Sequence, residues 1–176
     1  MTGLRLDPQD SRCHRPLTII RVFRREYDLA EHHARQAISL NPNDADDIAQ
    51  MGLVLTLRGH PEEALGWIDR AKRLNPFHPP YYDYWRGRTL YVLRRYAEAL
   101  QAYTRVPGLT SYIRVQLAAC YGQLGQAEQA RPYVDALLQD QPKLGAADYI
   151  DRDFAFERLE DREHLREGLL KAGLPP

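Results

Sequence analysis

The chain has 176 residues, of which 44% are hydrophobic, and its 24 basic side chains balance 24 acidic ones. A net charge of zero argues against a nucleic-acid-binding protein, which needs a basic excess, and the ordinary apolar content argues against wholesale disorder. No apolar run approaches the roughly 20 residues that span a bilayer, and the first residues hold no signal-peptide core. We therefore expect a soluble, cytoplasmic protein without a nucleic-acid or membrane partner, built as one domain or one repeat array.

Short phrases recur along the chain at a spacing close to 34 residues. A Leu-Asp-Pro or Leu-Asn-Pro triplet begins at Leu6, Leu40 and Leu74. A second phrase of four residues ends in alanine, and its last residues are Ala30, Ala64, Ala99 and Ala130. Two markers that share one period predict stacked repeats rather than a single central core.

Each repeat is expected to be a pair of helices joined by a tight turn, and residues 45–78 show this best. Apolar or small residues at helical spacing mark the buried face of a first helix: Ile48, Met51, Gly52 and Leu55. A second helix follows with the same kind of face: Ala64, Ile68 and Ala71. The breaker Gly59-His60-Pro61 ends the first helix, and Pro76 ends the second. One hairpin cannot bury these faces alone, so neighbouring hairpins must stack.

This order of residues resembles the tetratricopeptide-repeat (TPR) motif, and residues 111–144 resemble it almost as well. The matching positions there are Arg114, Leu117, Ala118, Tyr121, Ala130, Val134, Leu137 and Pro142. The resemblance implies an all-α fold, an α-solenoid of TPR helix-turn-helix hairpins with a C-terminal capping helix. The expected units are the end of a truncated preceding repeat (1–10), TPR 1 (11–44), TPR 2 (45–78), TPR 3 with a short second helix (79–110), TPR 4 (111–144), and a linker with the capping helix (145–176).

Two units depart from the motif in their first helices. In residues 11–44 the core positions of the first helix hold residues unlike the motif, so we expect a loose helix there: His14, Leu17, Thr18 and Arg21. In residues 79–110, Asp83 and Arg86 stand at usual core positions with Tyr82 and Trp85 beside them, which leaves the register of that helix open.

The second helices of the last two units contain breakers. Val106-Pro107-Gly108 cuts short the second helix of residues 79–110. Pro132 falls inside the second helix of residues 111–144, where it removes a backbone hydrogen bond. We expect a kink or a late start in that helix.

The C-terminal region predicts a capping helix with a solvated outer face. Asp161 is a candidate N-cap, and Gly173 can close the helix in left-handed geometry. The apolar stripe between them is Leu165, Leu169 and Ala172. Residues 148–167 are rich in charged side chains, which fits a solvated cap; an acidic tail that binds a partner is the alternative.

Parts of the chain are also similar to the TPR region that follows the catalytic domain in bacterial class III adenylate/guanylate cyclase-type proteins. The similar stretches are Asn75-Pro76-Phe77-His78-Pro79-Pro80-Tyr81-Tyr82, Gly87, Arg95-Tyr96-Ala97-Glu98-Ala99, and the ending 156–175. In that family the array is non-catalytic and is regulatory or protein-binding. Repeats and cap occupy the whole chain, and it opens partway through a unit. The chain could therefore be a regulatory C-terminal remnant or fragment of an adenylate cyclase-type signalling protein.

The sequence offers no pattern for catalysis, cofactor binding or metal binding. Its glycines form no phosphate-binding loop, and no CxxC or HExxH spacing occurs. Adjacent His32 and His33 point in different directions on a helix, so we interpret them as surface histidines. Cys120 lies among small residues, and we interpret it as a packing residue rather than a nucleophile. We expect no enzyme activity, no cofactor and no metal.

In TPR arrays the first helices line a concave groove, so the resemblance places certain positions on that surface. The candidate partner-binding residues are Tyr81, Tyr84, Arg88, Tyr91, Tyr112, Gln123, Arg15 and Leu53. Tyrosine and arginine are enriched at binding hot spots. Tyrosines at helical spacing can instead pack between repeats, and this alternative stays open. The Lys/Asn clamp for chaperone tails is missing, because Ile19 and Ala49 stand at such positions.

Three functional hypotheses follow. The first is a non-enzymatic scaffold that binds a peptide or protein partner in its concave groove. The second is the regulatory remnant of a cyclase described above. The third is homo-oligomerisation through the N-terminal half-repeat, whose apolar face would lack a neighbour.

Overall fold

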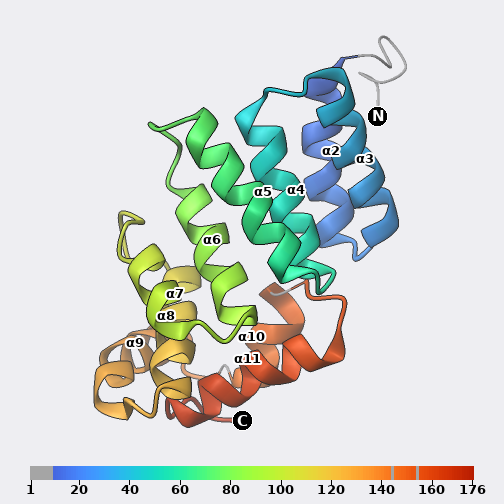
Figure 1. The fold of residues 1–176 in the computed structure, drawn as a ribbon. Coiled ribbons are helices and arrows are strands. Elements are labelled where there is room, and N and C mark those ends of the chain that lie inside the picture. Colours follow the sequence, from blue (N-terminus) through green and yellow to red (C-terminus); the bar gives the residue numbers. More distant parts are fainter. Residues whose placement is uncertain (1–9, 144, 154) are drawn as a thin grey trace.

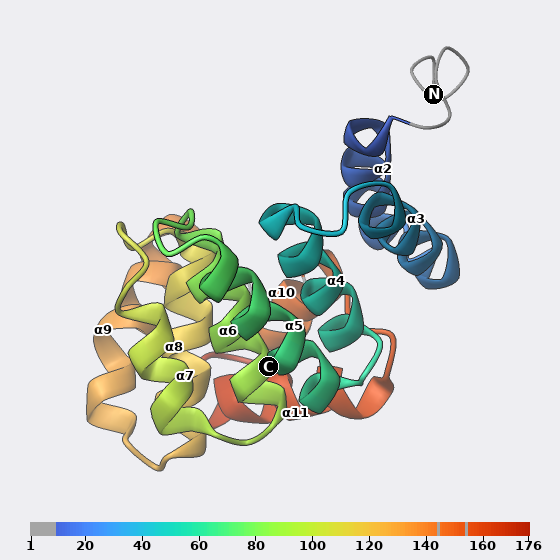
Figure 2. The same ribbon diagram turned by 45° about the horizontal axis from the view of Figure 1, so that its top comes forward.

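The computed structural model describes residues 10–143, 145–153 and 155–176, and every regular element in these ranges is an α-helix. In chain order the helices are α2 (Ser11–Phe23), α3 (Tyr27–Leu40), α4 (Ala45–Leu57), α5 (Pro61–Leu74), α6 (Tyr81–Val92), α7 (Tyr96–Tyr103), α8 (Ser111–Gln123), α9 (Ala127–Asp140), α10 (Ala146–Asp153) and α11 (Leu159–Lys171). Helices α2 to α9 pair into four consecutive hairpins, each in contact with the next (Figure 1). The hairpin α2–α3 lies at one end of the stack and α8–α9 at the other (Figure 2). The expected all-α solenoid is confirmed.

The four hairpins turn in the same way. At each turn one residue adopts the left-handed conformation: Arg25 (φ 58°), Gly59 (φ 80°), Arg94 (φ 60°) and Gly125 (φ 69°). The N–H of the next residue then donates back to a carbonyl of the first helix, as from His60 to Leu55 at 2.9 Å. This closure satisfies carbonyl groups that the helix end leaves free. Glycine fits the left-handed region without strain, whereas an L side chain costs roughly 1–2 kcal/mol there.

Small residues bring the two helices of a hairpin close together. Gly52 in α4 faces Ala64 in α5, and a Cβ on Gly52 would lie 2.9 Å from the carbonyl oxygen of Ala64. Gly87 in α6 similarly faces the ring of Tyr103 in α7. Gly52 and Gly87 are therefore required because the helices approach closely at these positions, and not because of turn geometry.

The first helix of residues 11–44 is not loose. α2 is a regular helix whose buried positions are His14, Thr18 and Val22. The Thr18 hydroxyl donates to the carbonyl of His14 at 3.1 Å, so the polar side chain is satisfied within its own helix. Asp10 caps the helix by accepting the N–H of Arg12 at 3.0 Å. Residues 1–9 lie outside the described residues, and with them nearly all of the expected half-repeat and its oligomer contact.

Three further features differ from or complete the expectations. α9 begins at Ala127 and continues through Pro132, so of the two expected effects of this proline the late start is wrong, and the kink stays a prediction. α7 has only eight residues, in line with the short second helix expected for residues 79–110.

In α6, Tyr82 is fully buried, while Asp83 is nearly buried in an ion pair with Lys72 of α5. Pairing explains how a carboxylate occupies a core position there.

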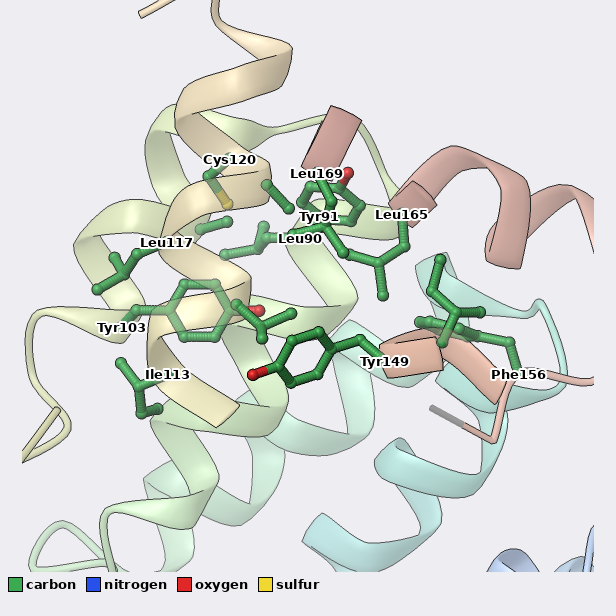
Figure 3. Packing of buried hydrophobic residues seen from close by; sticks show 14 of the residues in the cluster. Leu90, Tyr91, Tyr103, Ile113, Leu117, Cys120, Tyr149, Phe156, Leu165 and Leu169 are labelled. Carbon is green, nitrogen blue, oxygen red and sulfur yellow. The ribbon is translucent and has the colours of Figure 1, made fainter. Parts of the chain in front are cut away.

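The C-terminal segment runs back across the stack. α11 begins at Leu159, so Asp161 lies in its first turn and the prediction that it is the N-cap is wrong. Gly173 (φ 94°) ends the helix in left-handed geometry as predicted. Leu165 and Leu169 are fully buried among residues of α6 and α8 (Figure 3). The capping helix is thus part of the core on one face and solvated only on the other.

None of the helices in the described ranges is both long enough and apolar enough to cross a membrane.

Candidate partner-binding groove

The first helices of the four hairpins line one shared apolar cavity of about 450 Å³, here called the first-helix groove. Residues of α2, α4, α6 and α8 contribute, together with the segment after α7 and Ala155. Five of the eight sequence-predicted site residues lie in its lining: Leu53, Tyr81, Tyr84, Arg88 and Tyr112. Residues from every hairpin therefore meet at one surface.

The groove has a buried floor and an exposed rim. Leu53 and Arg88 on the floor are 6% and 8% exposed. Phe23 and Tyr112 on the rim are 71% and 53% exposed. The shielded floor thus combines an aliphatic side chain with one guanidinium, and the exposed aromatic side chains around it suit a site that takes an apolar ligand group.

The segment between α10 and α11 packs beside the groove. Phe156, between α10 and α11, is 1% exposed, and its ring centroid lies 5.0 Å from Cζ of Arg88. The backbone N–H of Glu157 donates to the carbonyl of Leu57 at 2.8 Å, at the C-terminal end of α4. Arg158 donates to the carbonyl of Gly59 at 3.0 Å. The segment 155–158 thus docks against the end of α4, and Ala155 contributes to the lining of the groove.

Two of the predicted site residues lie under α11 rather than in the open groove. Tyr91 is 1% exposed and lies in the buried core (Figure 3). Its hydroxyl donates to the carbonyl of His164 at 3.1 Å. Gln123 donates to the same carbonyl at 3.1 Å and accepts from Lys171. Burial raises the pKa of Tyr91, as expected for a phenol that has lost its water. Both side chains hold the capping helix in place.

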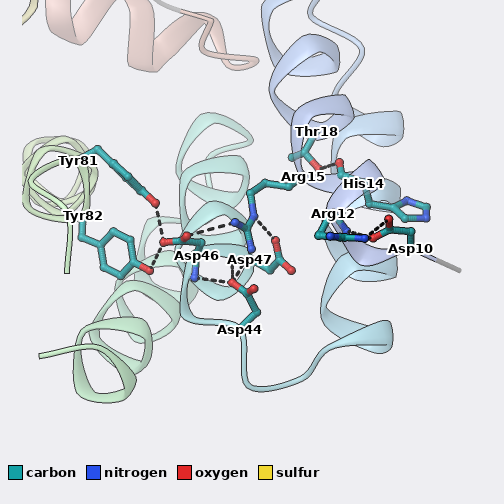
Figure 4. A network of polar contacts seen from close by, with 10 residues as sticks. All are labelled: Asp10, Arg12, His14, Arg15, Thr18, Asp44, Asp46, Asp47, Tyr81 and Tyr82. Carbon is teal, nitrogen blue, oxygen red and sulfur yellow. Dashed lines mark hydrogen bonds and ion pairs between the residues drawn. The ribbon is translucent and has the colours of Figure 1, made fainter. Parts of the chain in front are cut away.

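The eighth predicted residue, Arg15, lies at the opposite end of the groove within a polar network (Figure 4). Its guanidinium pairs with Asp44 at 2.6 Å, Asp46 at 3.2 Å and Asp47 at 2.7 Å. These three carboxylates stand at the start of α4, where Asp44 also caps the helix. The network ties α2 to α4.

Two tyrosine hydroxyls of α6 complete this network. Tyr81 and Tyr82 donate to the same oxygen of Asp46, at 2.6 and 2.7 Å. Burial alone would raise the pKa of Asp46, but the two phenol hydrogen bonds and Arg15 outweigh it, and the pKa lies below its ordinary value. For Asp47 burial dominates and the pKa is raised.

Sequence reasoning missed several lining residues. Trp85 lies beside Tyr84 in α6 and lines the groove, but the register of that helix could not be decided from the pattern. Gln50 lines a smaller cavity that adjoins the groove, and the repeat pattern did not mark it as a contact residue. No signal in the sequence marked Ala155, because docking of a distant segment follows no repeat period.

No trio of His, Cys, Asp or Glu side chains converges as a metal site within the described ranges. His14 of α2 and His33 of α3 face each other, with 3.1 Å between their Nδ1 atoms. Cys120 is fully buried, and burial raises its pKa far above the ordinary value, which makes it a poor nucleophile.

A family model described as anaphase-promoting complex, cyclosome, subunit 3, which is of the TPR class, matches residues 24–106. No curated protein matches the chain. Neither the family model nor the structures below is described as a cyclase, so nothing supports the narrower cyclase resemblance.

Several solved structures share the fold. PilW, described as a widely conserved type IV pilus biogenesis factor, is 20% identical, with a TM-score of 0.73 over 93% of this chain and 78% of its own. TTC0263 of Thermus thermophilus is 20% identical, with a TM-score of 0.67 over 96% and 86%. YrrB, described as a TPR protein with an unusual peptide-binding site, is 20% identical, with a TM-score of 0.60 over 97% and 89%. The chain therefore has the fold of a TPR-type helical repeat protein.

Proposed function

We propose that this chain is a non-enzymatic, cytoplasmic scaffold that binds a peptide or protein segment in the first-helix groove. The observation that carries the proposal is an open apolar cavity to which all four hairpins contribute. A surface assembled from four repeats is available only in the folded stack, which suits it to recognition of a partner. The partner class is a protein segment, without nucleic acid or membrane, because the chain has no net positive charge.

The residues assigned to partner contact are Leu53, Tyr81, Tyr84, Arg88, Tyr112 and Arg15. Tyrosine buries a large area at low entropic cost and still offers a hydroxyl for hydrogen bonding. Arg88 presents a guanidinium already positioned over an aromatic ring, Phe156. Tyr91 and Gln123 are assigned to the capping helix instead. The peptide-binding site named for YrrB supports a similar use of this fold here.

Neither the structure nor the similar proteins offer an observation that favours the cyclase-remnant hypothesis.

The test uses short peptides selected from a random display library on the wild-type chain. Tyr112→Ala, at an exposed rim position, and Tyr84→Ala should weaken the selected peptides by at least about tenfold, or about 1.4 kcal/mol. Tyr133→Ala is the matched control, because Tyr133 stacks on Tyr121 and does not line the groove. If the selected peptides bind both groove variants as tightly as they bind the wild-type chain, the assignment of the site is wrong.

A further inference from the structure

The first-helix groove continues into a second, smaller cavity of about 290 Å³ between α2, α4 and α6, here called the polar end. The two cavities share three lining residues: Ile19, Tyr81 and Trp85. The polar end adds Arg15, Asp46 and Gln50 to these walls. When one side chain of a peptide fills the larger cavity, the adjacent side chains of that peptide therefore lie next to the polar end.

The polar end carries an excess of negative charge. Asp44, Asp46 and Asp47 surround the single guanidinium of Arg15. Among the basic side chains of the described ranges, Arg12 pairs with Asp10 and Lys72 with Asp83, so neither of these two offsets the excess. Hydrogen bonds from two tyrosine hydroxyls favour the ionised form of Asp46. Such a site attracts a cation and repels carboxylate or phosphate groups.

Gln50 points independently to a hydrogen-bond donor in the ligand. Its side chain lines the polar end and the residue is only 3% exposed. Within the described ranges its Oε1 atom has no hydrogen-bond partner. A buried carbonyl oxygen without a donor is costly, and a donor supplied by a ligand would remove that cost. An ammonium or guanidinium group offers both the donor and the positive charge.

The adjoining walls suit the rest of such a ligand. The rings of Tyr81 and Trp85 have centroids 4.6 Å apart and form the boundary between the two cavities. Aromatic faces accept the methylene stem of lysine or arginine and attract its charge. Beyond them the larger cavity is apolar and takes bulky side chains.

We infer that the occupant of the first-helix groove is a peptide segment in which a lysine or arginine lies one or two positions from bulky apolar residues. The cation binds at the polar end, next to Asp46 and Gln50, and the apolar side chains fill the larger cavity. This inference rests on the proposed function and adds the chemistry of the partner. Acidic and phosphorylated segments are excluded by the same charges.

The first measurement is the composition of peptides selected from a random display library. Groove-dependent peptides are those whose binding is weakened by Tyr84→Ala and Tyr112→Ala. Among them a basic residue within two positions of a bulky apolar residue should be enriched over an acidic one. Replacing that basic residue by norleucine, which keeps the stem and removes the charge, should weaken binding about tenfold.

The second measurement changes the protein. Asp44→Asn removes one charge while keeping the helix cap, since asparagine caps as well as aspartate. Gln50→Met removes the amide at nearly constant volume. Each should weaken the basic peptide about tenfold and leave its norleucine analogue unchanged. Asp140→Asn is the charge-matched control, because Asp140 pairs with Arg114 outside both cavities, and it should have no effect.

The outcomes separate the two proposals. Groove-dependent peptides without enrichment of basic residues, or with equal affinity for norleucine, would overturn this inference and leave the proposed function standing. A selected pool in which no peptide depends on the groove would overturn both.

Discussion

Gly122 of α8 and Gly168 of α11 meet at a point where neither has room for a side chain. A Cβ on Gly122 would collide with the carbonyl oxygen of Gly168 and would lie 2.8 Å from the backbone nitrogen of Ala172. A Cβ on Gly168 would lie 2.9 Å from the carbonyl oxygen of Ala119. The backbone of α11 thus packs directly against the backbone of α8, the first helix of the fourth hairpin. The position of α11 depends on these two glycines.

Alanine at Gly122 should therefore destabilise the chain although alanine favours helices. The new methyl group meets backbone atoms of α11, which cannot rotate away, so we expect a loss of about 1–3 kcal/mol in the free energy of unfolding. Gly66→Ala in α5 is the matched control, because nothing lies within 4 Å of its Cβ position. That change should stabilise by roughly 0.5–1 kcal/mol. Urea unfolding of both variants checks this, and equal gains would contradict the close contact of α8 with α11.

Phe156 provides a second measure of how firmly the C-terminal segment is held. Its side chain is 1% exposed and lies against Arg88 and the buried core. Phe156→Ala should cost about 3–5 kcal/mol, since it removes a large buried ring. Phe77→Ala removes the same ring from a position that is 96% exposed, so its effect should stay within about 0.5 kcal/mol. Thermal or urea unfolding compares the two, and similar losses would count against a docked segment.

Most of the helical stack could be predicted because its causes are local and repeated. Ala64 and Ile68 stand at helical spacing in α5, and in the structure both are buried and face Gly52 of α4. The turns were also readable at Gly59, where glycine permits the left-handed conformation. The turn conformation of Arg25 could not be predicted from the residue itself, because the left-handed region is unfavourable for an L side chain.

The candidate site was predictable only in part, because it depends on contacts between distant segments. The lining positions of Tyr81, Tyr84 and Arg88 could be predicted, because these residues lie on the first helix of a repeat. Tyr91 stands about two turns beyond Tyr84 in the same helix, yet α11 covers it. The repeat pattern does not predict that residues 155–171 fold back over α6 and α8, because this contact occurs once and has no period.

His164 should make the stability of the capping helix depend on pH. Burial lowers its pKa below the ordinary value of 6.5, and the charges of Arg94 and Lys171 act in the same direction. Glu167 and the hydrogen bond with Tyr91 oppose this shift without cancelling it. The folded chain therefore prefers the neutral ring, while the unfolded chain takes up a proton near pH 6.5. This contribution to stability is fully present above pH 6.5 and is lost as pH falls below that value.

The measurement is the urea midpoint of unfolding at pH 7.5 and pH 5.5. The wild-type midpoint should fall on acidification, and His164→Gln should fall less because its side chain does not titrate. His60→Gln, at an exposed position, should retain the wild-type pH dependence. His33 contributes in the same direction, since burial also lowers its pKa, and it remains in all three proteins. An unchanged pH dependence in His164→Gln would remove His164 as the cause.

The two cysteines should differ sharply in reactivity. Cys120 is fully buried in α8 and burial raises its pKa, so almost no thiolate forms near neutral pH and reagents cannot reach the sulfur. Cys13 in α2 is partly exposed. Brief treatment of the native chain with iodoacetamide at pH 8 should therefore add one label, at Cys13, and treatment in urea should add two. Intact mass and peptide mapping read the result. Rapid labelling of native Cys120 would mean that α8 separates from α11 far more often than the glycine contact between them implies.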